Sequence, residues 1–128
     1  MAKTSPTQRS LKLLRDAGWQ VAIVEKWNQY VKIRQDLWGF GDLLACAAIP
    51  ELDVHRIAII QTTTQANAAA RLTKIVALPA AKKWIEAGGD IIIHGWRKVG
   101  PRGKRKVWEV LTRSVSLDDF AQPPQAES

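Results

Sequence analysis

Two polar positions at the ends of apolar segments carry residue types that suit a metal site. Asp42 directly precedes the apolar segment 43–48, and Gln61 directly follows the apolar run 57–60. If these segments pair as a hairpin, the carboxylate of Asp42 and the amide of Gln61 meet at one end of a sheet. Mg²⁺ prefers oxygen ligands and keeps several of its waters. An ion held there can activate water and stabilise negative charge at a phosphodiester bond.

A second group of residues is suited to a polyanion. Six of the ten residues in 97–106 are basic, and the glycines and proline of this stretch favour a loop. Such a loop can place cations along a phosphate backbone, where counterion release drives binding; a solvated hairpin tip is the alternative. Trp96 and Trp108 flank the loop and can either stack on unpaired bases or pack within a sheet. The basic residues are Arg97, Lys98, Arg102, Lys104, Arg105 and Lys106.

The charge of the whole chain favours the same kind of partner. The 128 residues include 19 Lys and Arg against 12 Asp and Glu, which gives a net charge of +7. This excess favours nucleic acid as a partner; a basic protein without such a partner is the alternative. The single cysteine, Cys46, excludes an internal disulfide and zinc-finger spacing. The P-loop, dinucleotide-binding, zinc-protease and nucleophile-elbow motifs are absent as well.

Length and hydropathy indicate the class of protein. The length is that of one domain, which is enough to fold around its own core. The N-terminal residues show no apolar stretch typical of a secretory signal, and no segment approaches 18 apolar residues. We therefore expect a cytoplasmic protein without a membrane partner.

The apolar pattern alternates between helix and strand signals. Ser5 and Pro6 are typical of a helix start, and Gly18 of its end. Segments rich in β-branched residues indicate strands, and Pro79 separates two helical stretches. The expected helices are 6–17, 65–78 and 79–87, and the expected strands are 19–25, 30–34, 43–48, 54–60, 90–96 and 107–112. We expect a turn at 26–29, and a flexible tail at 117–128 after a single domain at 1–116.

This order of elements predicts an α/β fold with a mixed central β-sheet flanked by helices. The run 57–60 is apolar on both faces, which is typical of a central strand covered on both sides. His94 lies within the strand expected at 90–96, and a lone strand histidine is more often structural than a ligand.

The same elements and polar positions resemble the PD-(D/E)XK, or restriction-endonuclease-like, nuclease superfamily. Its common core runs helix–strand–strand–strand–helix–strand, which corresponds to residues 5–112 here. In the superfamily a motif Asp lies at the second core strand, and a D/E-x-K tripeptide ends the third. In this chain Gly41-Asp42 occupies the first place and Gln61-Thr62-Thr63 the second. Gln61 therefore replaces an acid, and Thr63 replaces the lysine.

The resemblance implies a restriction-endonuclease-like α/β/α core and Mg²⁺- or Mn²⁺-dependent hydrolysis of phosphodiester bonds in DNA. It implies that Asp42 is the principal metal ligand. The amide oxygen of Gln61 and the carbonyl oxygen of Thr62 are then further ligands, and Thr63 orients water or phosphate.

Other charged residues complete this interpretation. Because Gln61 brings no negative charge, Asp36 or Glu25 can supply it, although ordinary surface acids are the alternative for both. Arg34 can neutralise a phosphate. Arg71 and Lys74 lie three apart on one helical face, where they either contact phosphate or stay solvated.

Three functions compete for these residues. The first is a Mg²⁺-dependent (endo)deoxyribonuclease. The substitutions at Gln61 and Thr63 also fit a catalytically inactive nucleic-acid-binding module of the same fold. The basic loop alone fits an interaction with an acidic protein. The residues by themselves leave DNA and RNA open, the resemblance favours DNA, and a homodimer that acts on both strands is a further expectation.

Overall fold

The fold is organised around one mixed β-sheet with helices on both faces. The computed structural model describes residues 5–52 and 54–120. Within them, the strands of the main sheet are β1 (Gln20–Ile23), β4 (Leu43–Ile49), β5 (Val54–Thr64), β6 (Asp90–Val99) and β7 (Val107–Val115). The helices are α1 (Pro6–Asp16), α2 (Ala68–Val76), α3 (Pro79–Glu86) and α4 (Leu117–Phe120), with short 3₁₀ turns η1 (Pro50–Leu52) and η2 (Gln65–Asn67).

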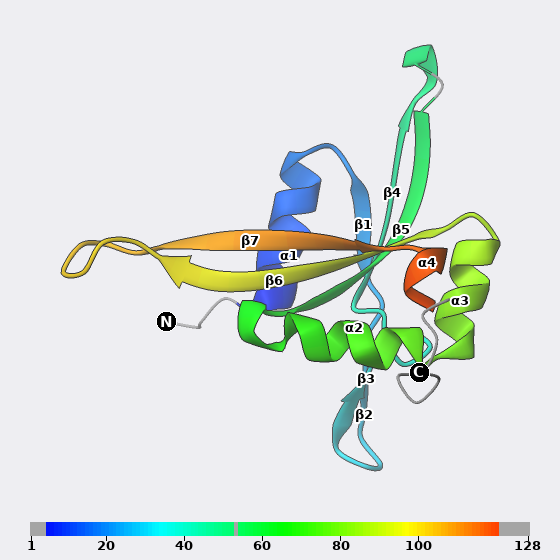
Figure 1. Cartoon of the computed structure of the whole chain (residues 1–128), viewed down its shortest axis with the longest axis horizontal. Helices are drawn as coiled ribbons and strands as arrows, with labels where there is room; N and C mark the ends of the chain where they lie inside the picture. Colours follow the sequence, from blue (N-terminus) through cyan, green and yellow to red (C-terminus); the bar gives the residue numbers. More distant parts are fainter. Residues whose placement is uncertain (1–4, 53, 121–128) are drawn as a thin grey trace, which may run out of the picture.

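The order of strands across the sheet is β1-β4-β5-β6-β7 (Figure 1). β5 and β6 run parallel, and every other neighbouring pair is antiparallel. A parallel pair needs a crossover connection, and α2 and α3 form it between β5 and β6. The predicted mixed α/β sheet is therefore confirmed.

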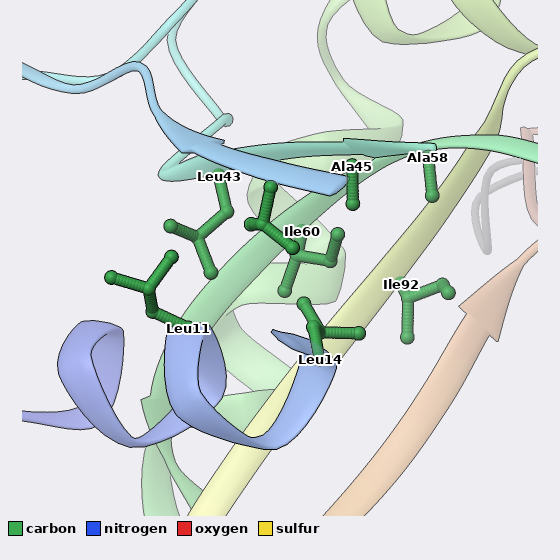
Figure 2. Packing of buried hydrophobic residues seen from close by; sticks show 8 residues of the cluster. Leu11, Leu14, Leu43, Ala45, Ala58, Ile60 and Ile92 are labelled. Atoms are coloured by element: carbon green, nitrogen blue, oxygen red, sulfur yellow. The ribbon is translucent and has the colours of Figure 1, made fainter. Parts of the chain in front are cut away.

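Two apolar clusters cover the two faces of the sheet. Ile59 and Ile60 are adjacent on β5 and both fully buried, so they point to opposite faces. Ile60 packs with Leu11 and Leu14 of α1, and Figure 2 shows these leucines facing the strands. On the opposite face Ile59 joins a cluster with residues of α2 and α3. The two-faced apolar run at 57–60 thus places β5 at the centre of the layers.

A separate two-stranded hairpin lies between β1 and β4 in the sequence. β2 (Lys26–Asn28) and β3 (Ile33–Gln35) pair antiparallel with each other and not with the main sheet. Figure 1 shows this hairpin projecting away from the sheet. The turn expected at 26–29 is therefore wrong, because residues 26–28 form a strand and the turn lies at 29–32.

Several boundaries differ from the sequence-based expectation because pairing with neighbours overrides local polarity. β5 continues through the polar residues 61–64, since these pair with 93–96 of β6. β6 and β7 also extend beyond 96 and 112. The helix expected at 65–78 begins with the 3₁₀ turn η2, and α2 ends at 76. Residues 117–120 form α4 where a tail was expected, and 121–128 lie outside the described residues.

In the described ranges, none of the helices combines the length and apolar character needed to cross a membrane.

Candidate metal centre

Asp42 is held at the start of β4 by tight local packing. Its backbone N–H donates to the carbonyl of Ile60 at 3.0 Å, and the residues before it form a turn closed between Leu37 and Gly41. A Cβ atom on Gly41 would lie 2.8 Å from Cγ2 of Ile59, which is closer than real side chains approach. Glycine is therefore required for the turn to pack against β5 and to fix the position of Asp42.

One oxygen of Asp42 receives three hydrogen bonds from β5. Oδ2 accepts from Nε2 of Gln61 at 2.7 Å, from the backbone N–H of Thr62 at 2.7 Å and from Oγ1 of Thr62 at 3.1 Å. The Thr62 hydroxyl donates to Asp42, so it accepts from Oγ1 of Thr7 in α1, 2.8 Å away. Because these donors occupy Oδ2, Oδ1 is the oxygen of Asp42 best placed to meet another group.

The register of β4 and β5 explains why these side chains meet. Leu43 pairs with Ile60, so the preceding Asp42 and the following Gln61 come together at the end of the pair. Thr7 is a contributor that sequence reasoning did not single out. Its position after Pro6, at the start of α1, was the available signal, since a helix start that packs on a strand end places its first side chains there.

Two more carboxyl groups reach Asp42. One oxygen each of Glu25, Asp36 and Asp42 lies within 4.8 Å of the others, and we call these residues the acidic cluster. Glu25 directly precedes β2 and Asp36 directly follows β3, so closure of this hairpin brings both acids to the same place. Glu25 is also paired with Arg34, whose Nη1 lies 3.1 Å from Oε1. The hairpin therefore builds the cluster from residues far from the motif positions.

The acidic cluster changes the acidity of Asp42. Burial, the largest cause, acts together with the neighbouring Glu25 and Asp36 to raise the pKa of Asp42 to about 8, whereas the Thr62 N–H acts in the opposite direction. Without a cation, this carboxyl group therefore keeps its proton at neutral pH. A divalent cation between the carboxyl groups would offset their repulsion and favour the ionised form.

The cluster lies in a pocket of about 330 Å³, which we call the metal pocket. Arg34 of β3 and Arg71 and Lys74 of α2 line it, so the three cations that the sequence suggested for phosphate share one site with the acids. Oε1 of Gln61 is buried and has no hydrogen-bond partner in the part of the chain that the structure describes. The remaining lining residues are Pro6, Thr7, Glu25, Asp36, Asp42, Gln61 and Thr62.

Thr63 does not join this site. It is buried but lies outside the lining of the metal pocket. Thr63 lies about 7 Å further along β5 than Gln61, because two residues of a strand cover that distance. It pairs with Gly95 of β6, whereas Gln61 pairs with Ile93. The role in orienting water or phosphate that the motif position implied for Thr63 has no geometric support here.

The other predicted cations lie on the β6–β7 hairpin. Arg97 is paired with Glu109 at 3.3 Å, and Nζ of Lys98 lies 5.3 Å from the ring centroid of Trp108. Figure 1 shows the loop at the far end of this long hairpin, well away from β2 and β3. The basic residues of this β6–β7 loop, residues 100–106, are all exposed: Arg102, Lys104, Arg105 and Lys106.

The two tryptophans beside this loop differ in their surroundings. Trp96 is buried and its Nε1 donates to Oγ of Ser10 at 2.9 Å, which makes it a core residue. Trp108 is 43% exposed, and the guanidinium carbon of Arg9 lies 3.5 Å from its ring centroid. Of the two, only Trp108 can present part of its ring to a ligand.

His94 is a structural residue. It is buried, and its Nδ1 lies 2.8 Å from Oγ of Ser10, which also accepts from Trp96. Burial lowers the pKa of His94 to about 4, so the ring is neutral at physiological pH. The Ser10 hydroxyl can therefore donate to Nδ1 while it accepts from Trp96, and the three side chains tie α1 to β6.

Comparison of the chain with protein-family models, with curated proteins and with solved structures gave no match.

Proposed function

We propose that the protein is a divalent-metal-dependent nuclease that hydrolyses phosphodiester bonds in DNA, as in the PD-(D/E)XK superfamily that its sequence resembles. The observation that carries the proposal is the acidic cluster. Its three carboxyl groups approach within 4.8 Å of one another in a pocket that also holds three cationic side chains. The order α1, β1, β4, β5, α2, β6 supports the proposal, because it corresponds to the order of the superfamily core.

The donor set of the pocket fits a hard divalent cation. Mg²⁺ and Mn²⁺ prefer oxygen ligands, and Mg²⁺ in enzymes is commonly held by a few carboxylates and waters. Asp42, Glu25 and Asp36 would hold the ion, with Oε1 of Gln61 as a neutral ligand. Glu25 and Asp36, at the two ends of the β2–β3 hairpin, supply the negative charge that Gln61 lacks. When bound, the ion supplies an activated water and neutralises charge at the phosphate.

The cations of the pocket are suited to the substrate's phosphate. Arg34 is oriented by its ion pair with Glu25, and Arg71 and Lys74 reach the pocket from α2. These α2 residues bring the positive charge that is missing at Thr63. The start of α1 also lines the pocket, and the N-terminus of a helix favours an anion. A phosphodiester group in the pocket would therefore meet positive charge from three elements.

The β6–β7 loop would bind the substrate away from the cut. Its exposed cations are suited to contacts with the phosphate backbone that do not depend on base sequence. In this proposal the metal pocket carries out the cleavage, and the β6–β7 loop contributes to the affinity for DNA.

A second function is favoured by the residue at position 61, because Gln61 stands where the superfamily has an acid. The raised pKa of Asp42 is consistent with this function, since it keeps the carboxyl group neutral when no cation is present. The cluster can thus persist without metal, as a catalytically inactive DNA-binding module of the same fold would require.

A cleavage assay separates the two functions. Wild type and Asp42→Asn are incubated with single-stranded, duplex, flapped and four-way-junction DNA in Mg²⁺, Mn²⁺ or EDTA. Asp16→Asn is the matched control, because it makes the same change at an exposed acid of α1. We expect wild type and the control to cut at least one substrate with metal, and Asp42→Asn to lose at least about 100-fold in rate. DNA binding without cutting under every condition would overturn the nuclease proposal in favour of the inactive module.

A further inference from the structure

The β2–β3 hairpin exposes large apolar side chains that the fold itself does not use. Trp27 is 58% exposed and Tyr30 is 89% exposed, and Val31 and Ile33 are more than half exposed. Figure 1 shows the hairpin projecting from the sheet. A two-stranded hairpin alone is at best marginally stable in water, and a cluster of exposed apolar residues indicates a binding surface.

The charge of the hairpin favours a polyanion over a second copy of the chain. Residues 26–35 contain Lys26, Lys32 and Arg34 and no acidic residue. A symmetric contact between two copies would bring these cations together in a chain that already carries a net charge of +7. Aromatic side chains interleaved with cations are instead what single-stranded nucleic acid requires, because bases stack and phosphates pair.

The register of the hairpin places Trp27 beside the metal pocket. Trp27 pairs directly with Arg34, so their side chains lie on the same face of the hairpin. Arg34 lines the metal pocket. If Arg34 contacts the phosphate near the cut, the base of an adjoining nucleotide lies within reach of the Trp27 ring.

The tip of the hairpin is ordered by one side chain. Oδ1 of Asn28 accepts from the backbone N–H of Tyr30 at 3.0 Å and of Val31 at 3.3 Å. Nδ2 of Asn28 donates to Oε1 of Gln35 at 3.2 Å, which ties the tip to the opposite strand. Tyr30 is thus held at the exposed end of the hairpin before any ligand binds.

We propose that the β2–β3 hairpin holds an unpaired base of the substrate on Trp27, with Tyr30 at the tip as a second stacking residue. The substrate class is then DNA that carries unpaired nucleotides next to the cut, such as a flap or a single-stranded end. This inference rests on the proposed nuclease function and specifies its substrate. Bases inside a blunt duplex are already stacked on each other, so Trp27 and Tyr30 add nothing to their binding.

Binding measured without metal tests the inference independently of cleavage. Fluorescence anisotropy in EDTA compares a single strand, a flapped duplex and a blunt duplex of matched length. Trp27→Leu keeps apolar bulk but removes the aromatic face, and Trp27→Phe retains that face. Leu52→Ala is the control, since Leu52 is 69% exposed on the separate β4–β5 arm. We expect Trp27→Leu to weaken binding of unpaired DNA about tenfold, with the blunt duplex, Trp27→Phe and the control unchanged.

A base analogue reports the contact directly. 2-Aminopurine placed in the flap next to the junction should be quenched by wild type and by Trp27→Phe, and not by Trp27→Leu. Tyr30→Leu provides a second variant at the fully exposed tip, and we expect a weaker effect of the same kind. Sedimentation of the same variants tests the competing occupant, a second copy of the chain.

The inference is overturned if Trp27→Leu binds unpaired DNA as wild type does, or if it loses the same factor on blunt duplex. A change in oligomeric state with unchanged DNA binding overturns it as well, in favour of a contact between copies. If the chain cuts no DNA but still binds unpaired bases through Trp27, the nuclease function fails and the hairpin's role stands. If the chain cuts blunt duplex as fast as flapped DNA, and Trp27→Leu binds unpaired DNA as wild type does, the hairpin's role fails and the nuclease function stands.

Discussion

The side-chain amide of Gln61 donates a hydrogen bond of 2.7 Å to Oδ2 of Asp42. The bond uses the amide nitrogen, and it leaves Oε1 of Gln61 buried without a hydrogen-bond partner among residues 5–52 and 54–120. A buried polar atom without a partner costs about 1–3 kcal/mol. A cation that contacts Oε1 would offset this cost, and this is the neutral ligand that the proposed metal site uses.

Replacing Gln61 with Glu should strengthen metal binding. The change adds a charged oxygen where the PD-(D/E)XK superfamily, which the sequence resembles, carries an acid, and it removes the donor to Asp42. We expect the affinity for Mn²⁺, measured by calorimetry, to rise about tenfold, because ligand charge sets the affinity of such sites. The metal-free protein should melt at a lower temperature, since one more carboxyl group is buried next to the acidic cluster without a cation. If wild type, Gln61→Glu and Gln61→Leu all bind Mn²⁺ with the same affinity, Gln61 is not a ligand of the proposed metal site.

Asp42→Asn should stabilise the protein when metal is absent. The pKa of Asp42 is raised from 3.8 to about 8 in the folded chain, so the folded state retains a proton that the unfolded state releases. The stability from this carboxyl group is fully present below pH 3.8 and is lost as pH rises through about 8. Asn cannot ionise, so the advantage of the variant should grow from pH 5 to pH 8.5.

Thermal unfolding in EDTA measures this difference. At pH 8.5 we expect Asp42→Asn to melt roughly 5 °C or more above wild type. Added Mg²⁺ should raise the melting temperature of wild type more than that of the variant, because only wild type has the complete acidic cluster. A difference in melting temperature that stays constant between pH 5 and pH 8.5 would contradict the raised pKa.

Neutralising the β6–β7 loop should weaken DNA binding without affecting the chemistry. In the combined variant Lys104→Ala, Arg105→Ala and Lys106→Ala, the dependence of log affinity on log salt should become shallower by up to about 3. The loss should be similar for all DNA sequences, because phosphate contacts carry no sequence information. Lys82→Ala on α3 is the control, since it removes an exposed cation elsewhere. An unchanged salt dependence would show that the loop is a solvated tip.

His94 should make the fold sensitive to acid. Burial lowers the pKa of His94 from 6.5 to about 4, so the unfolded chain takes up a proton that the folded chain refuses. The stability from this residue is fully present above pH 6.5 and is lost as pH falls through about 4. His94→Asn keeps an acceptor for the Ser10 hydroxyl but cannot be protonated. In urea denaturation, wild type should lose about 3 kcal/mol more than the variant between pH 7 and pH 4; parallel pH profiles would disprove this.

The sequence predicted those parts of the fold that follow from local signals. The cap at Ser5 and the proline at Pro6 marked the start of α1, and the Ser5 hydroxyl accepts from the N–H of Gln8 as expected. The run 57–60 predicted a central strand because its residues are apolar on both faces. The contact between Asp42 and Gln61 was predicted from pairing of β4 with β5. The observed register of these strands places the two side chains within hydrogen-bond distance.

The parts that could not be predicted depend on contacts distant in sequence. Lys26 to Asn28 have the composition of a turn, and they form a strand only because Ile33 to Gln35 pair with them. Closure of that hairpin brings Glu25 to Asp36, which no periodicity reveals. Thr63 was selected by its place in a motif, but the distance along β5 takes it out of the pocket. Motif spacing thus predicted the contact of Asp42 with Gln61, whereas closure of the hairpin places Glu25 and Asp36 beside them.

Binding of a divalent cation by the acidic cluster is the property on which the proposed function depends, and titration with Mn²⁺ measures it directly. Mn²⁺ is paramagnetic, so electron paramagnetic resonance reports the free ion as protein is added. Wild type and Asp16→Asn should bind Mn²⁺ at pH 8 and release it to excess Mg²⁺, and Asp42→Asn should lose this binding. If wild type binds no more Mn²⁺ than Asp42→Asn does, the cluster is not a metal centre and the proposed nuclease chemistry is contradicted.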